Sequence, residues 1–158
     1  MTFKLGIRIL VAMGICFFIG FLGQIATQAS VADWYPSLNK AWFHPPDWIF
    51  GPIWAVLYVL MGISAGIVWY KGFYHKWVKI ALYHFAFQLL LNGFWSLLFF
   101  GLNKPFLALL DIIALFVMLL FTIKWFKVVN EIAGYLLIPY AVWVLFAAIL
   151  NFEIWRLN

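Results

Sequence analysis

The sequence predicts an all-α integral membrane protein, a bundle of five transmembrane helices that forms one domain over residues 1–158. Three observations lead to this fold class. The composition is 68% hydrophobic and only 9% charged, with a mean hydropathy of +1.05, which is far outside the range of soluble domains. Five apolar runs are each long enough to cross a bilayer, which takes roughly 20 residues. The connections between the runs are short, so neighbouring helices are expected to run antiparallel.

The first run covers residues 9–32 and follows Lys4 and Arg8. A secretory signal starts in a similar way, but its apolar core has only about 7 to 15 residues and ends at a small-x-small cleavage site. This run is longer and lacks a clear site of that kind, so we expect a retained helix. It contains the single cysteine, Cys16, which has no disulfide partner and fits either a lipid-facing or a core position.

Four further runs complete the set. They cover residues 48–70, 80–103, 105–123 and 132–152. Asp111 is the only charged residue inside any of the five runs. No internal repeat is visible along them, which weighs against a transporter built from inverted repeats.

Lysine and arginine residues are distributed unequally between the two predicted membrane faces. Seven lie on the face of the N-terminus and three on the other: Lys4, Arg8, Lys71, Lys76, Lys79, Lys124 and Lys127 against Lys40, Lys104 and Arg156. The positive-inside rule therefore places the N-terminus in the cytoplasm and the loop at residues 33–47 outside. The net charge is +5, but the lysine and arginine residues occur singly along the chain and form no basic cluster. Nucleic acid is therefore not an expected partner.

Helical spacing places aromatic and polar residues together on one stripe of three different helices. The stripes are Trp54, Tyr58, Met61 and Ala65 on the second helix, Gln88, Asn92, Trp95, Ser96 and Phe99 on the third, and Tyr140, Trp143, Ala147 and Asn151 on the fifth. Unpaired amides in hydrocarbon cost roughly 1 to 3 kcal/mol, so these faces should turn inward. Two interpretations remain: the stripes hold the helices together by interhelical hydrogen bonds, or they line a pocket.

Asp111 and His84 are candidates for a functional role inside the membrane. An intramembrane carboxylate indicates a proton or cation site by default, but Asp111 has no second acid or base near it in its helix, which favours a neutral or hydrogen-bonded structural role. His84 could be an axial ligand of haem iron or a hydrogen-bonded packing residue. We expect no protein-held metal, because the chain has no ligand cluster with metal-binding spacing.

Gly62 and Gly66 form a GxxxG pair on the second helix, whose partner is either another helix of the bundle or a second protomer. The chain contains no GxSxG, HExxH, Walker or dinucleotide-binding pattern. Classical hydrolytic or nucleotide chemistry is therefore not expected.

The stretch from Trp34 to Trp54 covers most of the loop at residues 33–47 and the start of the second helix, and it reads "WYPSLNKAWFHPPDWIFGPIW". Its prolines, Pro36, Pro45, Pro46 and Pro52, exclude regular helix from most of the stretch and favour extended backbone before each of them. The loop should therefore be stiff. Its tryptophans serve either as headgroup anchors or as an aromatic lid over the bundle.

At this point the chain resembles a known family, the tryptophan-rich sensory proteins (TspO), which are related to the mitochondrial translocator protein, or peripheral-type benzodiazepine receptor. The resemblance covers nearly the whole chain through "WYPSLNKAWFHPPDWIFGPIWAVLYVLMG", "QLLLNGFWSLLFFG", the acid in the fourth span and "LLIPYAVWVLFAAILNFEIWRLN". It implies a five-helix bundle, often a homodimer, in a membrane that we expect to be a bacterial inner membrane. It also implies ligands: porphyrins such as protoporphyrin IX and haem, other planar hydrophobic molecules, and in some members sterols and benzodiazepine-like compounds.

The resemblance also places a ligand pocket on this sequence. It falls on Tyr35 and neighbouring loop residues such as Trp42, on Trp54, on Asn92 and Trp95, and on Trp143 and Ala147. With the rest of the stripes, the predicted ligand-binding set adds Tyr58, Gln88, Phe99, Tyr140 and Asn151. No cofactor is expected to be required, and porphyrin or haem enters as the ligand.

Two positions depart from the family pattern. The loop has Ala41 after Lys40 where the family usually has proline, which leaves the loop less rigid there. The sterol-associated pattern falls on Leu150, Phe152 and Arg156, with phenylalanine in place of the usual tyrosine, so sterol binding lacks its hydroxyl.

Three functions follow from the resemblance. The first is a membrane receptor or sensor that binds porphyrin under the loop and acts in tetrapyrrole regulation and stress response. The second is an enzyme that degrades porphyrin with light and oxygen, with Trp54 and Trp143 as candidate catalytic residues. The third is a porphyrin or lipid transporter, which lacks support from broken helices or charged relays.

Overall fold

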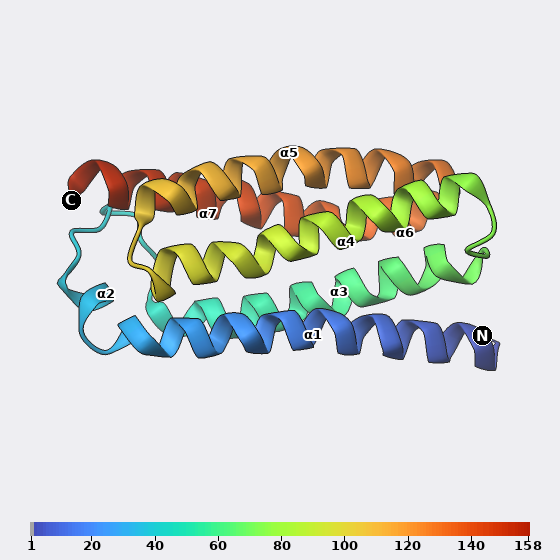
Figure 1. Cartoon of the computed structure of the whole chain (residues 1–158), viewed down its shortest axis with the longest axis horizontal. Helices are drawn as coiled ribbons and strands as arrows, with labels where there is room; N and C mark the ends of the chain where they lie inside the picture. Colours follow the sequence, from blue (N-terminus) through green and yellow to red (C-terminus); the bar gives the residue numbers. More distant parts are fainter. Residues whose placement is uncertain (1) are drawn as a thin grey trace.

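A computed structural model describes residues 2–158 and shows the helices of the chain lying side by side along one axis (Figure 1). Five helical stretches are long and apolar enough to cross a membrane: Phe3–Val31, Asp47–Tyr70, Lys76–Gly101, Pro105–Val129 and Glu131–Leu157. The predicted fold class, an all-α membrane protein with five spans, is confirmed.

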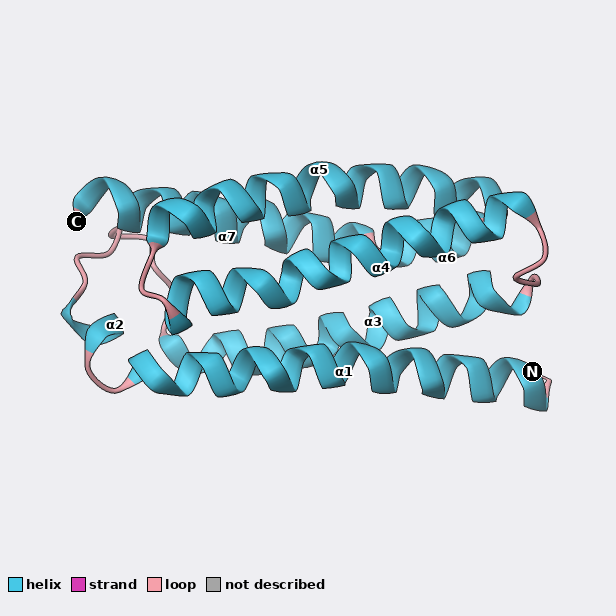
Figure 2. Ribbon diagram, in the orientation of Figure 1, coloured by secondary structure: helices cyan, strands magenta, loops and turns pink. Residues whose placement is uncertain are grey.

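The helices follow each other with short connections, drawn as loops in Figure 2. In chain order they are α1 (Phe3–Val31), α2 (Trp34–Ser37), the 3₁₀ turn η1 (Asp47–Ile49), α3 (Phe50–Tyr70), α4 (Lys76–Ser96), the π-helical turn η2 (Leu97–Gly101), α5 (Pro105–Val129), α6 (Glu131–Leu136) and α7 (Ile138–Leu157). The fifth span consists of α6 and α7, with a break at Leu137 just before Pro139.

The helices are longer than the predicted spans at several ends. α1 begins at Phe3 instead of residue 9, and α5 ends at Val129 instead of residue 123. The prediction was bounded by the first charged residue, but a charge marks only the edge of the hydrocarbon layer. Backbone hydrogen bonds continue through the headgroup region, where lysine side chains reach water, until a cap such as Thr2 ends the helix.

The loop at residues 33–47 contains more helix than its prolines predict. α2 forms one turn, and Pro36 fits there because the first turn of a helix leaves its N–H groups unpaired in any case. The stretch between α2 and η1 is irregular, as expected from Pro45 and Pro46. In Figure 1 this segment crosses the end of the bundle that also carries the C-terminus.

Close contact between α1 and α3 explains the GxxxG pair. A Cβ atom on Gly62 would lie 2.6 Å from Cα of Met13, and one on Gly66 would lie 2.6 Å from Cα of Ile9. The partner of the pair is therefore α1 of the same chain, so its small side chains serve the bundle itself. Cys16, also on α1, is fully buried and belongs to the core.

The turn η2 interrupts the regular spiral of the third span. π-helical turns are rare and usually occur at functional sites. Ser30 near the end of α1 holds this turn by donating to the carbonyl of Phe100, and its hydroxyl lies 2.6 Å from Oδ1 of Asn103, which has a φ of 54°. The wider turn lets Phe99 and Phe100, two consecutive residues, both face the interior space described next.

Candidate functional site

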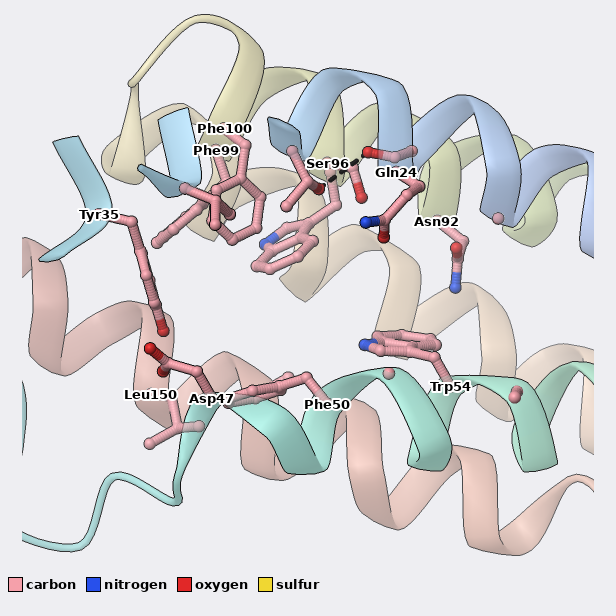
Figure 3. Close-up of a pocket in the computed structure, with 18 of the residues that line it drawn as sticks. Gln24, Tyr35, Asp47, Phe50, Trp54, Asn92, Ser96, Phe99, Phe100 and Leu150 are labelled. Carbon is pink, nitrogen blue, oxygen red and sulfur yellow. Dashed lines mark hydrogen bonds between the residues drawn. The ribbon is translucent and has the colours of Figure 1, made fainter. Parts of the chain in front are cut away.

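A cavity of about 640 Å³ lies at the end of the bundle that carries α2, and Figure 3 shows its walls. This volume is in the range of small-molecule sites, roughly 300 to 1,000 Å³. The wall residues come from five parts of the chain: Phe17, Gly20, Phe21, Gly23, Gln24, Thr27 and Val31 on α1; Tyr35, His44, Asp47 and Trp48 from the loop and η1; Phe50, Gly51, Trp54, Ala55 and Tyr58 on α3; Asn92, Trp95, Ser96, Phe99 and Phe100 on α4 and η2; and Ala147, Leu150, Asn151 and Ile154 on α7.

Two stacked aromatic pairs form walls of the cavity. Trp54 stacks on Tyr58 with ring centroids 5.7 Å apart and an interplanar angle of 28°. Trp95 stacks on Phe99 at 5.1 Å and 21°. The first pair belongs to α3 and the second to α4 and η2, so flat apolar surfaces enter the cavity from separate spans.

The predicted amides hold aromatic side chains in place. Asn92 accepts a hydrogen bond from the hydroxyl of Tyr58 at 3.0 Å and donates to the hydroxyl of Tyr140 at 2.8 Å. Asn151 accepts from the indole N–H of Trp95 at 2.9 Å and donates to the carbonyl of Pro105 at 2.8 Å. Asn92 and Asn151 therefore make hydrogen bonds between helices and also line the cavity.

Gln88 and Tyr140 lie beneath the cavity and not in its wall. Both are fully buried, and the hydroxyl of Tyr140 donates to Oε1 of Gln88 at 2.9 Å. Together with Asn92 and Tyr58 they make a chain of hydrogen bonds that joins α3, α4 and α7. Gln88 and Tyr140 were predicted to bind ligand. In the structure they do not line the cavity, and they hold the wall residue Asn92 through hydrogen bonds.

The rim of the cavity contains a hydrogen-bonded pair from the loop. The hydroxyl of Tyr35 lies 2.7 Å from Nε2 of His44. Burial, followed by the charge of Asp47, raises the pKa of Tyr35, so the phenol is protonated at neutral pH. Burial lowers the pKa of His44, with Lys40 acting in the same direction and Asp47 opposing it. The neutral imidazole can accept a hydrogen bond from the phenol when its own hydrogen is on Nδ1.

Trp42 and Trp143 were predicted to bind ligand, but the structure places neither in the cavity wall. Trp42 is 94% exposed in the loop, and the ring of Phe43 packs beside it. Trp143 lies behind Phe50, with ring centroids 5.7 Å apart, and Phe50 is the residue that faces the cavity. Of the two candidate catalytic residues, Trp54 lies in the cavity wall and Trp143 packs against Phe50 outside it.

The sterol-associated residues do not form one surface. Leu150 faces the cavity, whereas Phe152 is 42% exposed and packs against Trp155 on the outside of α7. Arg156 lies near the end of the helix in an ion pair with Glu153. Residues 150 and 152 are about 200° apart around a helix, which separates them.

Asp111 and His84 also lie outside the cavity wall. Oδ2 of Asp111 is buried and has no hydrogen-bond partner within residues 2–158. Nδ1 of His84 donates to the carbonyl of Ile80 at 2.7 Å, and the ring packs beside Trp125. These contacts are those of a hydrogen-bonded packing residue, which was one of the two interpretations of His84.

The wall contributed by α1 was not predicted from the sequence. Small and polar residues recur on α1 at helical spacing, namely Gly20, Gly23, Gln24 and Thr27. This spacing places them on one face of the helix, and it could have predicted that this face lines a cavity. Phe17, Phe21 and Val31 beside them are well exposed although they line the cavity, as is Trp48 opposite them. These exposed wall residues place part of the cavity near the surface of the bundle.

The arrangement suits a flat, mainly apolar molecule. Stacked rings provide the faces of the cavity, and hydrogen bonds to Asn92 and Asn151 hold Tyr58 and Trp95 in position. In Figure 3 the amide of Gln24 points into the space above Trp54, and Asp47 lies on the opposite side, next to Tyr35. Among residues 2–158, no three His, Cys, Asp or Glu side chains lie close enough to hold a metal ion. The site can bind and orient a ligand, and the redox-active groups of its aromatic wall are indoles and phenols, such as those of Trp54, Trp95 and Tyr58.

Comparisons with known proteins show which family the chain is similar to. The family model described as the TspO/MBR family matches residues 12–156. The tryptophan-rich protein TspO of Archaeoglobus fulgidus is 46% identical over 141 residues, which cover 89% of this chain and 90% of the relative. The translocator protein of Bos taurus is 39% identical over 140 residues, covering 88% and 83%. The tryptophan-rich sensory protein of Cereibacter sphaeroides is 34% identical over 145 residues, covering 89% of each chain.

Proposed function

The chain belongs to the TspO/MBR family, and from this premise we propose that it is a membrane receptor that binds porphyrins in the cavity under the loop. The observation that carries the proposal is the pair of aromatic stacks, Trp54 on Tyr58 and Trp95 on Phe99, in one cavity. A porphyrin has two large flat faces and an apolar rim, and such faces gain about 0.5 to 1.5 kcal/mol from each aromatic contact beyond area burial.

The loop supports this role as a partial lid. Tyr35, His44 and Asp47 come from the loop and its junction with η1 and lie in the cavity wall, so a bound molecule would contact the loop directly. A ligand with differential contacts to the loop shifts its position, and that shift is the signal a partner can read. We assign the readout to tetrapyrrole regulation and stress response, as the family resemblance implies.

Replacing Trp54 tests the proposal. Protoporphyrin IX is titrated into the purified protein in lipid nanodiscs, and binding is followed by the absorbance of the porphyrin. Trp54→Leu should weaken binding by about tenfold, which corresponds to about 1.4 kcal/mol, because it removes a stacking face. Trp42→Leu is the matched control and should bind like the wild type, because Trp42 is outside the wall. Equal affinity of all three proteins would contradict the assignment.

Porphyrin breakdown is the second candidate, and the position of Trp54 favours it. Its indole is a redox-active group placed where a ligand face would lie. Under light and air, oxygen would be the net oxidant and would be reduced as the macrocycle is oxidised, while the indole of Trp54 would give one electron to the excited macrocycle and regain one as the oxidised product forms. Illumination of the loaded protein should then bleach the porphyrin, and Trp54→Phe, which keeps an aromatic face, should slow the bleaching. An unchanged spectrum after illumination would leave binding alone.

We also propose an orientation of the chain in the membrane and a homodimer. We place the N-terminus in the cytoplasm, in a bacterial inner membrane, from the charge count; reporter fusions at both termini test this. A homodimer would have to use a face other than Gly62 and Gly66, because these glycines contact α1 of their own chain.

A further inference from the structure

Tyr35 and His44 form a polar pair that the aromatic walls do not explain. Both line the cavity, and Oη of Tyr35 lies 2.7 Å from Nε2 of His44. A hydrophobic lid would need neither group. In Figure 3 the hydroxyl of Tyr35 ends at the side of the cavity, close to the carboxylate of Asp47.

The phenol is held firmly by its surroundings. The ring of Tyr35 is 8% exposed and packs against Phe100 with centroids 5.3 Å apart and against Phe99 at 6.2 Å. The ammonium of Lys40 donates to the carbonyl of Tyr35 at 2.8 Å and lies 4.5 Å from the centre of its ring. The hydroxyl is therefore presented from a fixed position, as a ligand atom needs to be.

The chemistry of the pair suits a hard metal ion. A phenol becomes a strong ligand for ferric iron when a neighbouring base takes its proton, and tyrosinate is a known axial ligand of haem. The described residues hold no cluster of three His, Cys, Asp or Glu that could bind a bare ion. Iron inside a tetrapyrrole does not need one, because the macrocycle supplies four nitrogen ligands and the protein supplies only the axial position.

We propose that Tyr35 is the axial ligand of ferric haem in this cavity, with His44 as the acceptor of its proton. In this step the O–H bond of Tyr35 breaks, an oxygen–iron bond forms, and the proton moves to Nε2 of His44; iron stays ferric and no electron is transferred. The inference rests on the proposed porphyrin site and adds a distinction to it: the site recognises the metal as well as the macrocycle.

His84, the histidine considered as a haem ligand from the sequence, lies away from this site. His84 is outside the cavity wall and already donates Nδ1 to the carbonyl of Ile80. His84→Gln is therefore a matched control for a histidine change that should not affect the ligand.

The test compares haem with metal-free protoporphyrin IX in the full-length protein. Both are titrated into the wild type and into Tyr35→Phe, His44→Gln and His84→Gln, and the ferric haem complexes are examined by resonance Raman and electron paramagnetic resonance spectroscopy. The wild type should show the phenolate vibrations of an iron–tyrosinate bond. Tyr35→Phe should lose them and weaken haem binding by about tenfold or more, while metal-free porphyrin binds as before. His44→Gln should keep the vibrations and weaken haem binding, and His84→Gln should match the wild type.

Retained binding of metal-free porphyrin also shows that each variant is folded. Failure of both ligands to bind the wild type would contradict the proposed function itself. Normal binding of both ligands, with haem spectra unchanged by Tyr35→Phe, would overturn only the axial assignment. A histidine-type spectrum that His44→Gln abolishes and Tyr35→Phe preserves would also overturn it, because His44 would then be the ligand.

Discussion

Asn92 illustrates how much a single residue does here, because its amide fixes two tyrosines from two other helices. Tyr58 donates to it from α3, and it donates to Tyr140 on α7. Helical spacing predicted that Asn92 and Gln88 face inward. It could not predict that Tyr140 connects them, because the rotation of α7 relative to α4 depends on packing that no single helix encodes.

Removing the hydroxyl of Tyr140 tests this buried network. Tyr140→Phe keeps the ring but leaves Nδ2 of Asn92 and Oε1 of Gln88 without their partner. An unsatisfied buried polar group costs about 1 to 3 kcal/mol, so the variant should melt at a clearly lower temperature in detergent. Tyr135→Phe is the matched control, since Tyr135 is 54% exposed, and its melting temperature should equal that of the wild type. Equal melting of both variants would show that the network adds no stability.

At the level of elements, the contact between α1 and α3 sets one side of the cavity. The two helices touch closely at Gly62 and Gly66, and Tyr58 of α3 lies against Gly20 of α1 where the cavity begins. The sequence predicted both helices and the GxxxG device, but left the partner undetermined, since small residues allow close approach to any helix.

An added methyl group at Gly62 should disturb this contact. Its Cβ would lie 2.6 Å from Cα and 2.7 Å from the backbone nitrogen of Met13, and a backbone cannot move aside as a side chain can. Gly62→Ala should destabilise the protein by about 1 to 3 kcal/mol, measured as denaturant or thermal unfolding in detergent.

Gly14→Ala is the control for this change, because no atom of another helix lies within 4 Å of the position that its added methyl group would take. It should be neutral or stabilise α1 by up to about 1 kcal/mol through helix propensity. A Gly62→Ala variant as stable as Gly14→Ala would contradict the close packing of α1 on α3.

The loop and the turn η2 show where prediction from sequence ends. Prolines identify residues 33–47 as stiff, but they do not predict that Tyr35 is buried while Trp42 is exposed. Both are aromatic residues in one loop, and only the packing of Phe99 and Phe100 beneath Tyr35 distinguishes them. The π-helical turn that presents these two rings has no sequence signature that we could use.

On the scale of the whole molecule, the bundle collects its cavity residues at one end. The two termini lie at opposite ends in Figure 1, as an odd number of spans requires, and α2 lies at the end opposite the N-terminus. Apolar runs and charges were enough to predict the five spans. The wall from α1 could not be recognised as cavity lining without knowing which helices are neighbours, and neither could the exclusion of Trp143 by Phe50.

The most direct test of the account is an experimental structure of the protein with protoporphyrin IX in a lipid environment. We expect the macrocycle in the cavity at the α2 end, against the rings of Trp54 and Trp95, with the loop residue Tyr35 at its side. A macrocycle bound to the outer face of the bundle, for example beside the exposed stack of Trp77 and Trp125, with the cavity filled by lipid, would contradict it.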